Sequence, residues 1–352
     1  MQIDVILDTR AKAQDLARLG QLAERHGIGG VWVSSLNDSR DPFTNLSVLA
    51  QATSRITLGP IAVNPFDTHP FKLAAAFFTL NELARGRARI VIGGGGEALA
   101  ALGLAPQRRV RAVRECVGIV RRAGSGEMVT FEGELYQVRG CRLGWIEAPV
   151  PPIYVGAGQP QMLRMAAAVA DGIMMSDVPP APAREVIATL DAALEQAGRS
   201  REGNADAAPG AGAAPGNDSF RTSVFTAWHV YADEAEARRE AKRWLLLRGI
   251  FRPWLLAAFL EPADVQLVMA SRAAFARAFA AGSDVVEGVP DRILDALVDN
   301  VTLCATPRGI DKIVTKLRAL RDAGLGAVAL RLYANPAESI RLIGERVVGA
   351  LE

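Results

Sequence analysis

The sequence predicts an α/β fold in which strands and helices alternate and close into a (β/α)8 TIM barrel with insertions. Short apolar runs rich in Val, Ile and Met recur along the chain, and each is followed by a segment with apolar residues at helical spacing. Such alternation is typical of parallel strands joined by right-handed crossovers. The near-even spacing of about eight units favours a closed barrel over the alternative, an open doubly wound sheet divided into two domains.

Each predicted strand is a short apolar segment that ends at a polar residue or a glycine. The strands are expected at residues 3–7, 30–35, 56–63, 89–92, 153–155, 172–175, 224–231 and 327–332. Several of the helices between them begin at proline, which is favoured in the first helical turn. These helices are expected at residues 11–26, 42–54, 70–84, 107–122, 159–169, 184–197, 306–323 and 336–351.

Three segments interrupt the alternation, and we interpret them as insertions into a single domain spanning residues 1–352. A β-hairpin with a tight Glu132-Gly133 turn is expected near residues 125–150. Residues 200–219 are rich in Gly, Ala and Pro and cannot bury enough apolar surface to offset the entropy of ordering, so they predict a mobile loop. Residues near 234–300 predict a mostly helical insertion.

Composition excludes several classes of function. The 352 residues carry 40 basic and 38 acidic side chains, a net charge of +2, which gives no reason to expect nucleic acid or a membrane as partner. The three cysteines are far apart and have no metal-ligand spacing, as expected in a reducing compartment. With no export signal and no apolar run long enough to span a bilayer, we expect a cytoplasmic protein.

The strongest candidate binding element is the glycine turn Gly156-Ala157-Gly158, which lies between a buried strand and a helix. Uncovered backbone N–H groups and the helix dipole point the same way at such a turn, which favours an anion such as a cofactor phosphate. A plain turn whose glycines only permit positive φ is the alternative. A Rossmann dinucleotide motif is disfavoured because Gln161 replaces the third glycine.

Other candidate residues are isolated. The glycines at positions 93–96 follow the fourth strand and would let a flat ligand approach the backbone, or form a flexible turn. His69 and Asp8 follow barrel strands and are candidate catalytic acids, although a solvated histidine and a loop or helix-capping aspartate are the simpler interpretations. His229 faces either the barrel interior or the helix layer, and no residue cluster has the spacing of a metal site.

Several segments share a pattern with a known family, in the same order along nearly the whole chain. They include LGPIAVNPF at 58–66, His69-Pro70, TLNEL at 79–83, GRA at 86–88, IGGG at 92–95, PIYVGA at 152–157, ADG at 170–172 and SIRLIGE at 339–345. Together they resemble the bacterial luciferase-like flavin barrel family, specifically its methylene-tetrahydromethanopterin reductase branch, which uses the deazaflavin coenzyme F420.

The resemblance implies a barrel that holds a flat deazaflavin or flavin at the carboxyl ends of its strands. It places a non-prolyl cis peptide at about Ile61-Ala62, behind the central ring. The cofactor-binding residues that it implies are Ser35, Ile61, Ala62, Asn64, Gly93, Gly94, Gly156, Ala157, Gly158, Gln159 and Ser176.

The same resemblance implies an F420-dependent oxidoreductase that transfers hydride between reduced deazaflavin and a small organic substrate, and a homodimer. The branch's Asp-His pair is replaced here by Ser35-Leu36, and its strand-one glutamate by Ile6, so its acid–base groups are not matched. One alternative is an FMN-dependent monooxygenase that uses oxygen and a partner flavin reductase. Another is a cofactor-binding relative without turnover.

Overall fold

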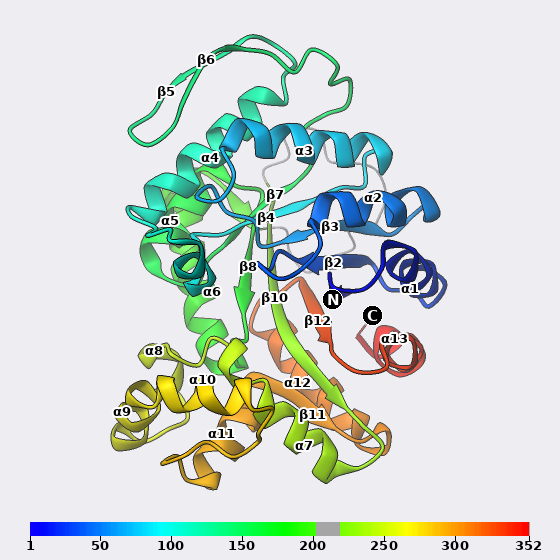
Figure 1. Ribbon diagram of the computed structural model, residues 1–352, viewed down its shortest axis with the longest axis vertical. Helices are drawn as coiled ribbons and strands as arrows, with labels where there is room; N and C mark the ends of the chain where they lie inside the picture. The colour runs from blue at the N-terminus through cyan, green and yellow to red at the C-terminus, as the bar shows by residue number, and fades with distance from the viewer. Residues whose placement is uncertain (202–218, 352) are drawn as a thin grey trace.

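The computed structural model describes residues 1–201 and 219–351, and these form the predicted barrel (Figure 1). Its strands are β1 (Gln2–Leu7), β2 (Gly30–Ser34), β3 (Thr57–Ile61), β4 (Ile90–Ile92), β7 (Ile153–Gly156), β8 (Gly172–Ser176), β10 (Ser219–Val230) and β12 (Ala327–Leu332). They are parallel neighbours in the order β3-β2-β1-β12-β10-β8-β7-β4. Parallel bridges from Leu58 to Ala88 and from Val63 to Ile92 join β3 to β4 and close the ring. The open doubly wound sheet is therefore wrong.

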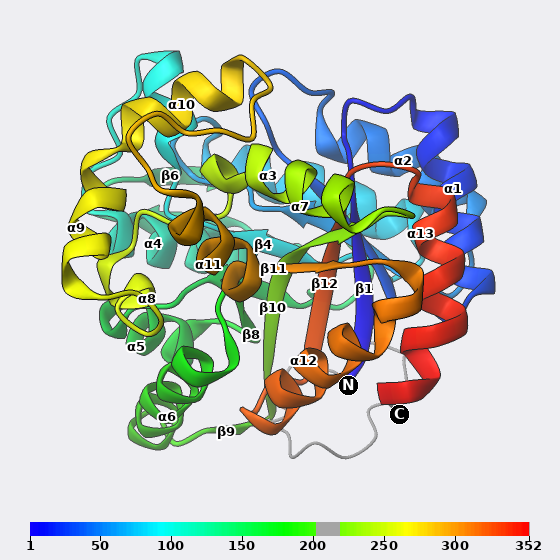
Figure 2. The ribbon, with the colours of Figure 1, turned by 90° about the horizontal axis from the view of Figure 1, so that it is seen from below.

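Helices surround this ring, as Figures 1 and 2 show. They are α1 (Ala13–Arg25), α2 (Pro42–Ala52), α3 (Pro70–Leu83), α4 (Arg109–Ala123), α5 (Pro160–Val169), α6 (Pro180–Gln196), α12 (Ile310–Asp322) and α13 (Pro336–Ile343). Proline begins α2, α3, α5, α6 and α13, because the N–H that it lacks has no partner in a first turn. Because proline is accepted in the first turn, α6 begins at Pro180, earlier than the start at residue 184 that the sequence pattern indicated.

The hairpin expected near residues 125–150 is present as antiparallel strands β5 (Val129–Glu132) and β6 (Gln137–Cys141). It extends away from the barrel beside α3 and α4 in Figure 1. The buried carboxylate of Glu115 in α4 accepts hydrogen bonds from the backbone N–H groups of Glu134, Leu135 and Tyr136 at 2.9–3.0 Å. These bonds anchor the tip of the hairpin to the helix layer.

The segment after β10 is helical, as expected, but it ends in an additional strand. It contains α7 (Glu234–Arg243), α8 (Pro253–Leu256), α9 (Pro262–Ala270), α10 (Arg272–Ala280) and α11 (Asp291–Val301). Both ribbon views show α8 to α11 gathered on one side of the barrel. The additional strand, β11 (Thr302–Ala305), pairs with β10. This strand was not predicted because it directly follows α11, with no glycine or proline to mark where the helix ends.

Most of the predicted mobile loop at 200–219 lies outside the described residues. Its first two residues form a short strand, β9 (Ser200–Arg201), which pairs with the first residues of β10. Ser219 likewise belongs to β10 rather than to a loop. Over residues 1–201 and 219–351, none of the helices has both the length and the apolar character needed to cross a membrane.

A buried ion pair closes the amino-terminal end of the barrel. The Asp4 carboxylate in β1 lies 2.7 Å from the Arg89 guanidinium and accepts a hydrogen bond from Trp32 Nε1 at 2.9 Å. The guanidinium also lies over the Trp32 ring, 4.4 Å from its centroid. Close approach here requires glycine, since a Cβ at Gly59 would come within 1.8 Å of the Arg89 carbonyl oxygen. With this end filled, any ligand space lies toward the carboxyl ends of the strands.

Candidate functional site

A cavity of about 340 Å³ lies at the carboxyl end of the barrel. Residues from all eight barrel strands, or from the segments just after them, contribute to its wall, and one further residue comes from the segment before α8. The lining residues are Ile6, Ser34, Ile61, Ala62, Val91, Gly156, Ala157, Gly158, Met174, Met175, Ser176, Val178, Phe225, Arg252 and Arg331. The cavity is therefore mostly apolar, with hydroxyl groups and two guanidinium groups as its polar side chains.

One side of the cavity is a wall of small residues, formed by Ala62 just after β3 and Gly156 in β7. The peptide bond between Ile61 and Ala62 is cis, which confirms the expectation from the resemblance. Gly93 packs behind it, where a Cβ would lie 3.2 Å from the Ala62 Cβ. A Cβ added at Gly156 would in turn lie 3.7 Å from the Gly93 Cα. With no side chain larger than a methyl group at Ala62, Gly93 and Gly156, a planar group can approach this wall closely.

The glycine turn lies beside the same wall and leads into α5. Gly156, Ala157 and Gly158 all line the cavity. The Ala157 N–H is not free, because it donates to the Met174 carbonyl oxygen at 3.3 Å. The N-cap residue Gln159 has extended backbone angles and makes no capping hydrogen bond with its own side chain. The start of α5 therefore presents backbone N–H groups that its own cap does not cover.

Six of the residues expected to bind a cofactor line the cavity, namely Ile61, Ala62, Gly156, Ala157, Gly158 and Ser176. The other five do not. Gly93 supports Ala62 from behind, and Gly94 faces the Arg109 and Met162 side chains.

The remaining three lie at the rim or in adjoining turns. Ser35 donates its N–H to the Ile61 carbonyl, while its neighbour Ser34 lines the cavity instead. Asn64 stabilises the turn after β3 by accepting from the backbone N–H groups of Phe66 and Asp67. Gln159 is exposed.

Asp8 and His69, the candidate acids, do not line the cavity. Asp8 is half-exposed; its carboxylate accepts a hydrogen bond from the Arg10 N–H and lies 3.9 Å from the Arg10 guanidinium. His69 is the N-cap of α3, where Nδ1 accepts a hydrogen bond from the Phe71 N–H at 3.2 Å. Its ring also meets the edge of Tyr136 from the hairpin. His69 thus caps a helix, which is neither the catalytic nor the merely solvated role considered from the sequence, and Asp8 takes the simpler role of a loop aspartate.

The sequence analysis missed the two arginines that reach the cavity. Arg331 lies near the end of β12 and donates a hydrogen bond to the Ser34 hydroxyl. Arg252 precedes α8, donates to the Ser176 carbonyl at 2.8 Å and lies over the Trp254 ring. Burial lowers the pKa of both guanidinium groups. The signal for Arg331 was available, since a lone arginine in the apolar strand 327–332 points to a special environment.

Behind these arginines is a buried ion pair between Asp177 and Arg248, 3.2 Å apart. Burial raises the pKa of Asp177, and the nearby positive charges of Arg248 and Arg252 oppose that rise. Asp177 has a left-handed φ of 49°, rare for a residue with a side chain, which turns its carboxylate inward at the end of β8.

His229 is buried next to this pair and stacks on Tyr333, with ring centroids 4.9 Å apart. Neither of its ring nitrogens has a hydrogen-bond partner among the described residues. Burial, together with the Arg248 charge, lowers its pKa to about 3. His229 is therefore neutral and is separated from the cavity lining.

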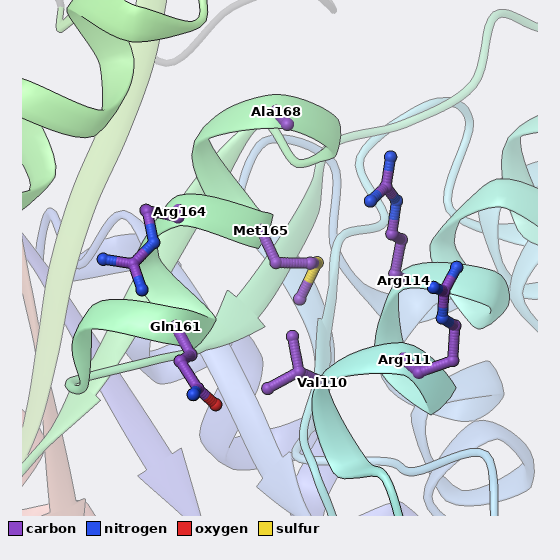
Figure 3. Close-up of a pocket in the computed structure, with 7 residues that line it drawn as sticks. All are labelled: Val110, Arg111, Arg114, Gln161, Arg164, Met165 and Ala168. Carbon is purple, nitrogen blue, oxygen red and sulfur yellow. The ribbon is translucent and has the colours of Figure 1, made fainter.

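A second hollow of about 420 Å³ lies on the outside of the barrel, between α4 and α5 (Figure 3). Arg111 and Arg114 border it on α4, and Arg164 borders it on α5, around a floor that includes Met165. It shares no lining residue with the barrel cavity. All three arginines are exposed, and Arg111 pairs with Glu134 at 2.8 Å. Arginine and valine alternate along residues 108–122, a pattern typical of a helix with one solvated face, and Arg111 and Arg114 lie on that face.

Comparison with known proteins identifies the family. The model for "Luciferase-like monooxygenase" matches residues 1–326. The chain belongs to this family. One relative, 5,10-methylenetetrahydromethanopterin reductase of Archaeoglobus fulgidus, is 28% identical over 355 residues, which cover 97% of each chain. A second, F420-dependent glucose-6-phosphate dehydrogenase of Nakamurella multipartita, is 34% identical over 205 residues, 53% of this chain and 59% of that protein.

Among solved structures, the coenzyme F420 dependent tetrahydromethanopterin reductase from Methanopyrus kandleri has the same fold. Its TM-score is 0.75 at 20% identity, with 100% of this chain and 99% of that chain covered. Among the described residues, no group of three or more His, Cys, Asp or Glu side chains has the arrangement of a metal site.

Proposed function

We propose that this luciferase-like protein is a coenzyme F420-dependent oxidoreductase that transfers hydride between reduced deazaflavin and a small organic substrate. The observation that carries the proposal is the combination, in one cavity, of a wall of small residues with the glycine turn that begins α5. Its relatives include an F420-dependent glucose-6-phosphate dehydrogenase and a structural neighbour described as coenzyme F420 dependent.

The residues present fit such a cofactor. Ala62, backed by Gly93, and Gly156 provide the flat surface that a tricyclic ring requires. The start of α5, just after the turn from Gly156 to Gly158, provides backbone donors for a phosphate, and Arg252 adds a guanidinium on the same side of the cavity. Trp254, which lies under Arg252, would be 3.8 Å from a Cβ at Gly158, so it holds the arginine next to the turn.

The protein's own contribution to the reaction is positioning and exclusion of water. A bound deazaflavin supplies the hydride chemistry, and the barrel needs few reactive side chains of its own. Ile6, Met174 and Phe225 give the remaining wall an apolar surface, which excludes water from the space beside the small-residue wall. Ser34, which lies beside Ile61 in the neighbouring strand β2, and Arg331 in β12 are polar groups that line this space.

Two experiments test the proposal. The first titrates the protein with F420 and with FMN, and the second assays hydride transfer to a panel of carbonyl compounds. We expect F420 to bind at least a hundredfold more tightly, a difference of about 2.7 kcal/mol. Preference for FMN, with oxygen-dependent turnover on externally reduced flavin, would instead identify a two-component monooxygenase served by a partner flavin reductase. Tight binding of F420 without any hydride transfer would identify a binding protein without turnover.

We further propose a homodimer in the cytoplasm. The free state of Cys116, Cys141 and Cys304 supports a reducing compartment. Sedimentation velocity measures the oligomeric state, and a monomer at micromolar concentration would refute the dimer.

A further inference from the structure

At the open end of the barrel, one arginine is buried and two are partly buried, and one carboxylate is buried with them. Arg248, Arg252 and Arg331 lie around it, and the carboxylate of Asp177 pairs with Arg248. Arg252 and Arg331 have only neutral hydrogen-bond partners, two carbonyls for the first and the Ser34 hydroxyl for the second. Among the described residues, neither of these two guanidinium groups has a carboxylate within 4.0 Å. A charge removed from water is costly without a counter-ion, so a ligand that brings negative charge fits both positions.

The two cations are associated with different halves of the closed barrel. Going round the closed barrel, β3, β4, β7 and β8 are consecutive, and β2, β1, β12 and β10 form the other half. The small-residue wall and the glycine turn belong to the first half, and Arg252 bonds to it through the carbonyl of Ser176 in β8. Arg331 belongs to β12 in the second half. Arg252 is thus placed for a cofactor phosphate, and Arg331 faces the space in front of the cofactor wall.

The immediate surroundings of Arg331 are those of a recognition site for a small anion. The guanidinium is held in place by the Ser34 hydroxyl and by the face of Tyr333, 5.6 Å from its centre. Ile6 and Phe225 flank it with apolar surface in the cavity lining. Two more distant carboxylates, Asp8 and Asp177, also act on its charge, but neither bonds to it. A planar guanidinium fixed in this way is suited to bind a carboxylate or a phosphate through two parallel hydrogen bonds.

We propose that the substrate of this enzyme is a small organic anion, whose carboxylate or phosphate group is bound by Arg331 and Ser34 on the β2 and β12 side of the cavity. This inference rests on the proposed function, since it assigns the cofactor to the other half of the barrel. Ile6 and Phe225 then contact the carbon skeleton between the anionic group and the reacting carbon. Arg331 is the residue that selects an anionic over a neutral substrate.

The test compares matched probes by isothermal titration calorimetry on protein saturated with oxidised F420, which cannot reduce them. Acetoacetate and its neutral counterpart acetoacetamide form the carboxylate arm, and methyl phosphate forms the phosphate arm. We expect the wild type to bind one of the two anions at least tenfold more tightly than acetoacetamide. Arg331→Met should reduce that preference to less than twofold and should change the dissociation constant for F420 less than threefold.

Two further variants separate the roles of the cations. Arg331→Lys retains the positive charge but cannot form two parallel hydrogen bonds, so it should show a preference for the anion between those of wild type and Arg331→Met. This variant also provides the test if Arg331→Met does not fold. Arg252→Met should show the reverse pattern, with F420 binding weakened at least tenfold and the preference for the anion retained.

The proposal is overturned if the wild type shows no preference for either anion, if the preference survives Arg331→Met, or if Arg331→Met weakens F420 binding as Arg252→Met does. Failure of the proposed function gives a different result, because wild-type protein would then fail to prefer F420 over FMN or would bind F420 without transferring hydride. In that event the preference for the anion over acetoacetamide can be measured without cofactor. The difference in this preference between wild type and Arg331→Met still decides whether Arg331 selects anions.

Discussion

Replacing Asp4 by Asn tests whether the buried ion pair at the amino-terminal end of the barrel stabilises the fold. The side chains of Asp4 and Arg89 are only 2% and 7% exposed, and the carboxylate accepts hydrogen bonds from Gln2, Trp32 and Arg89. The substitution leaves the Arg89 charge buried without a counter-ion, and breaking such a pair costs about 3–5 kcal/mol. The unfolding entropy of a 352-residue chain is about 0.7 kcal/mol/K, so we expect Tm to fall by about 4–7 °C.

Thermal unfolding followed by circular dichroism measures the change, with Asp38→Asn as the matched control. Asp38 also pairs with an arginine, Arg10, at 3.5 Å, but the two side chains are 71% and 42% exposed. Exposed pairs contribute about 0–1 kcal/mol, so the control should shift Tm by less than about 2 °C. Equal shifts in the two variants would refute the reasoning. The double variant with Arg89→Met should lose less than the sum of the single losses, because it leaves no charge unpaired.

Three other substitutions test separate features of the fold. Glu24 accepts hydrogen bonds from three consecutive backbone N–H groups just before β3; burial opposes its ionisation, but these bonds outweigh it and lower its pKa from 4.5 to about 2. Because the pKa of Glu24 is depressed in the folded state, its ionised form stabilises the fold above pH 4.5. Glu24→Gln should therefore lower the free energy of unfolding there by about 1–2 kcal/mol, a value reduced to allow for solvent exposure. Urea unfolding at a series of pH values measures this difference, which should vanish as the pH falls toward 2. Gly59→Ala places a methyl group against the Arg89 carbonyl and should lower the free energy of unfolding, measured with urea, by about 1–3 kcal/mol or more. The control is Gly349→Ala: a Cβ at Gly349 meets no atom within 4 Å and its φ is −64°, so this substitution should change the free energy of unfolding by less than about 1 kcal/mol. Lys316→Met removes three hydrogen bonds to backbone carbonyls at the end of α11 and should lower the free energy of unfolding by about 1–3 kcal/mol; no measurable loss would mean that water replaces the amine there.

The barrel could be predicted because its signals are local. An apolar run followed by helical spacing, with proline at the start of a helix, is visible within about 15–20 residues of sequence. The same holds for the turn from Gly156 to Gly158, which the structure places in the lining of the cavity. Strand β11 gave no such signal, because it directly follows α11 without a turn residue between them and is recognisable mainly through its pairing with β10.

The polar groups of the site were not predictable in this way, because their neighbours are distant in sequence. Arg331 meets Ser34 across 297 positions, since β12 and β2 both lie beside β1 in the closed ring. Arg252 comes from the helical insertion and reaches Ser176 at the end of β8. His69 and Asp8 illustrate the converse, because a residue that follows a strand can equally well cap the next helix or bond to its own loop.

By itself the sequence determined that this chain alternates strand and helix, where its glycine turn lies and which family it resembles, because each depends on neighbouring residues or on their order. The tertiary structure decided which side chains share the cavity. Closure of the sheet brings eight strand ends together and selects the few polar groups that face inward, Arg331 and Ser34 among them. That selection depends on contacts between distant parts of the chain, and no local pattern records it.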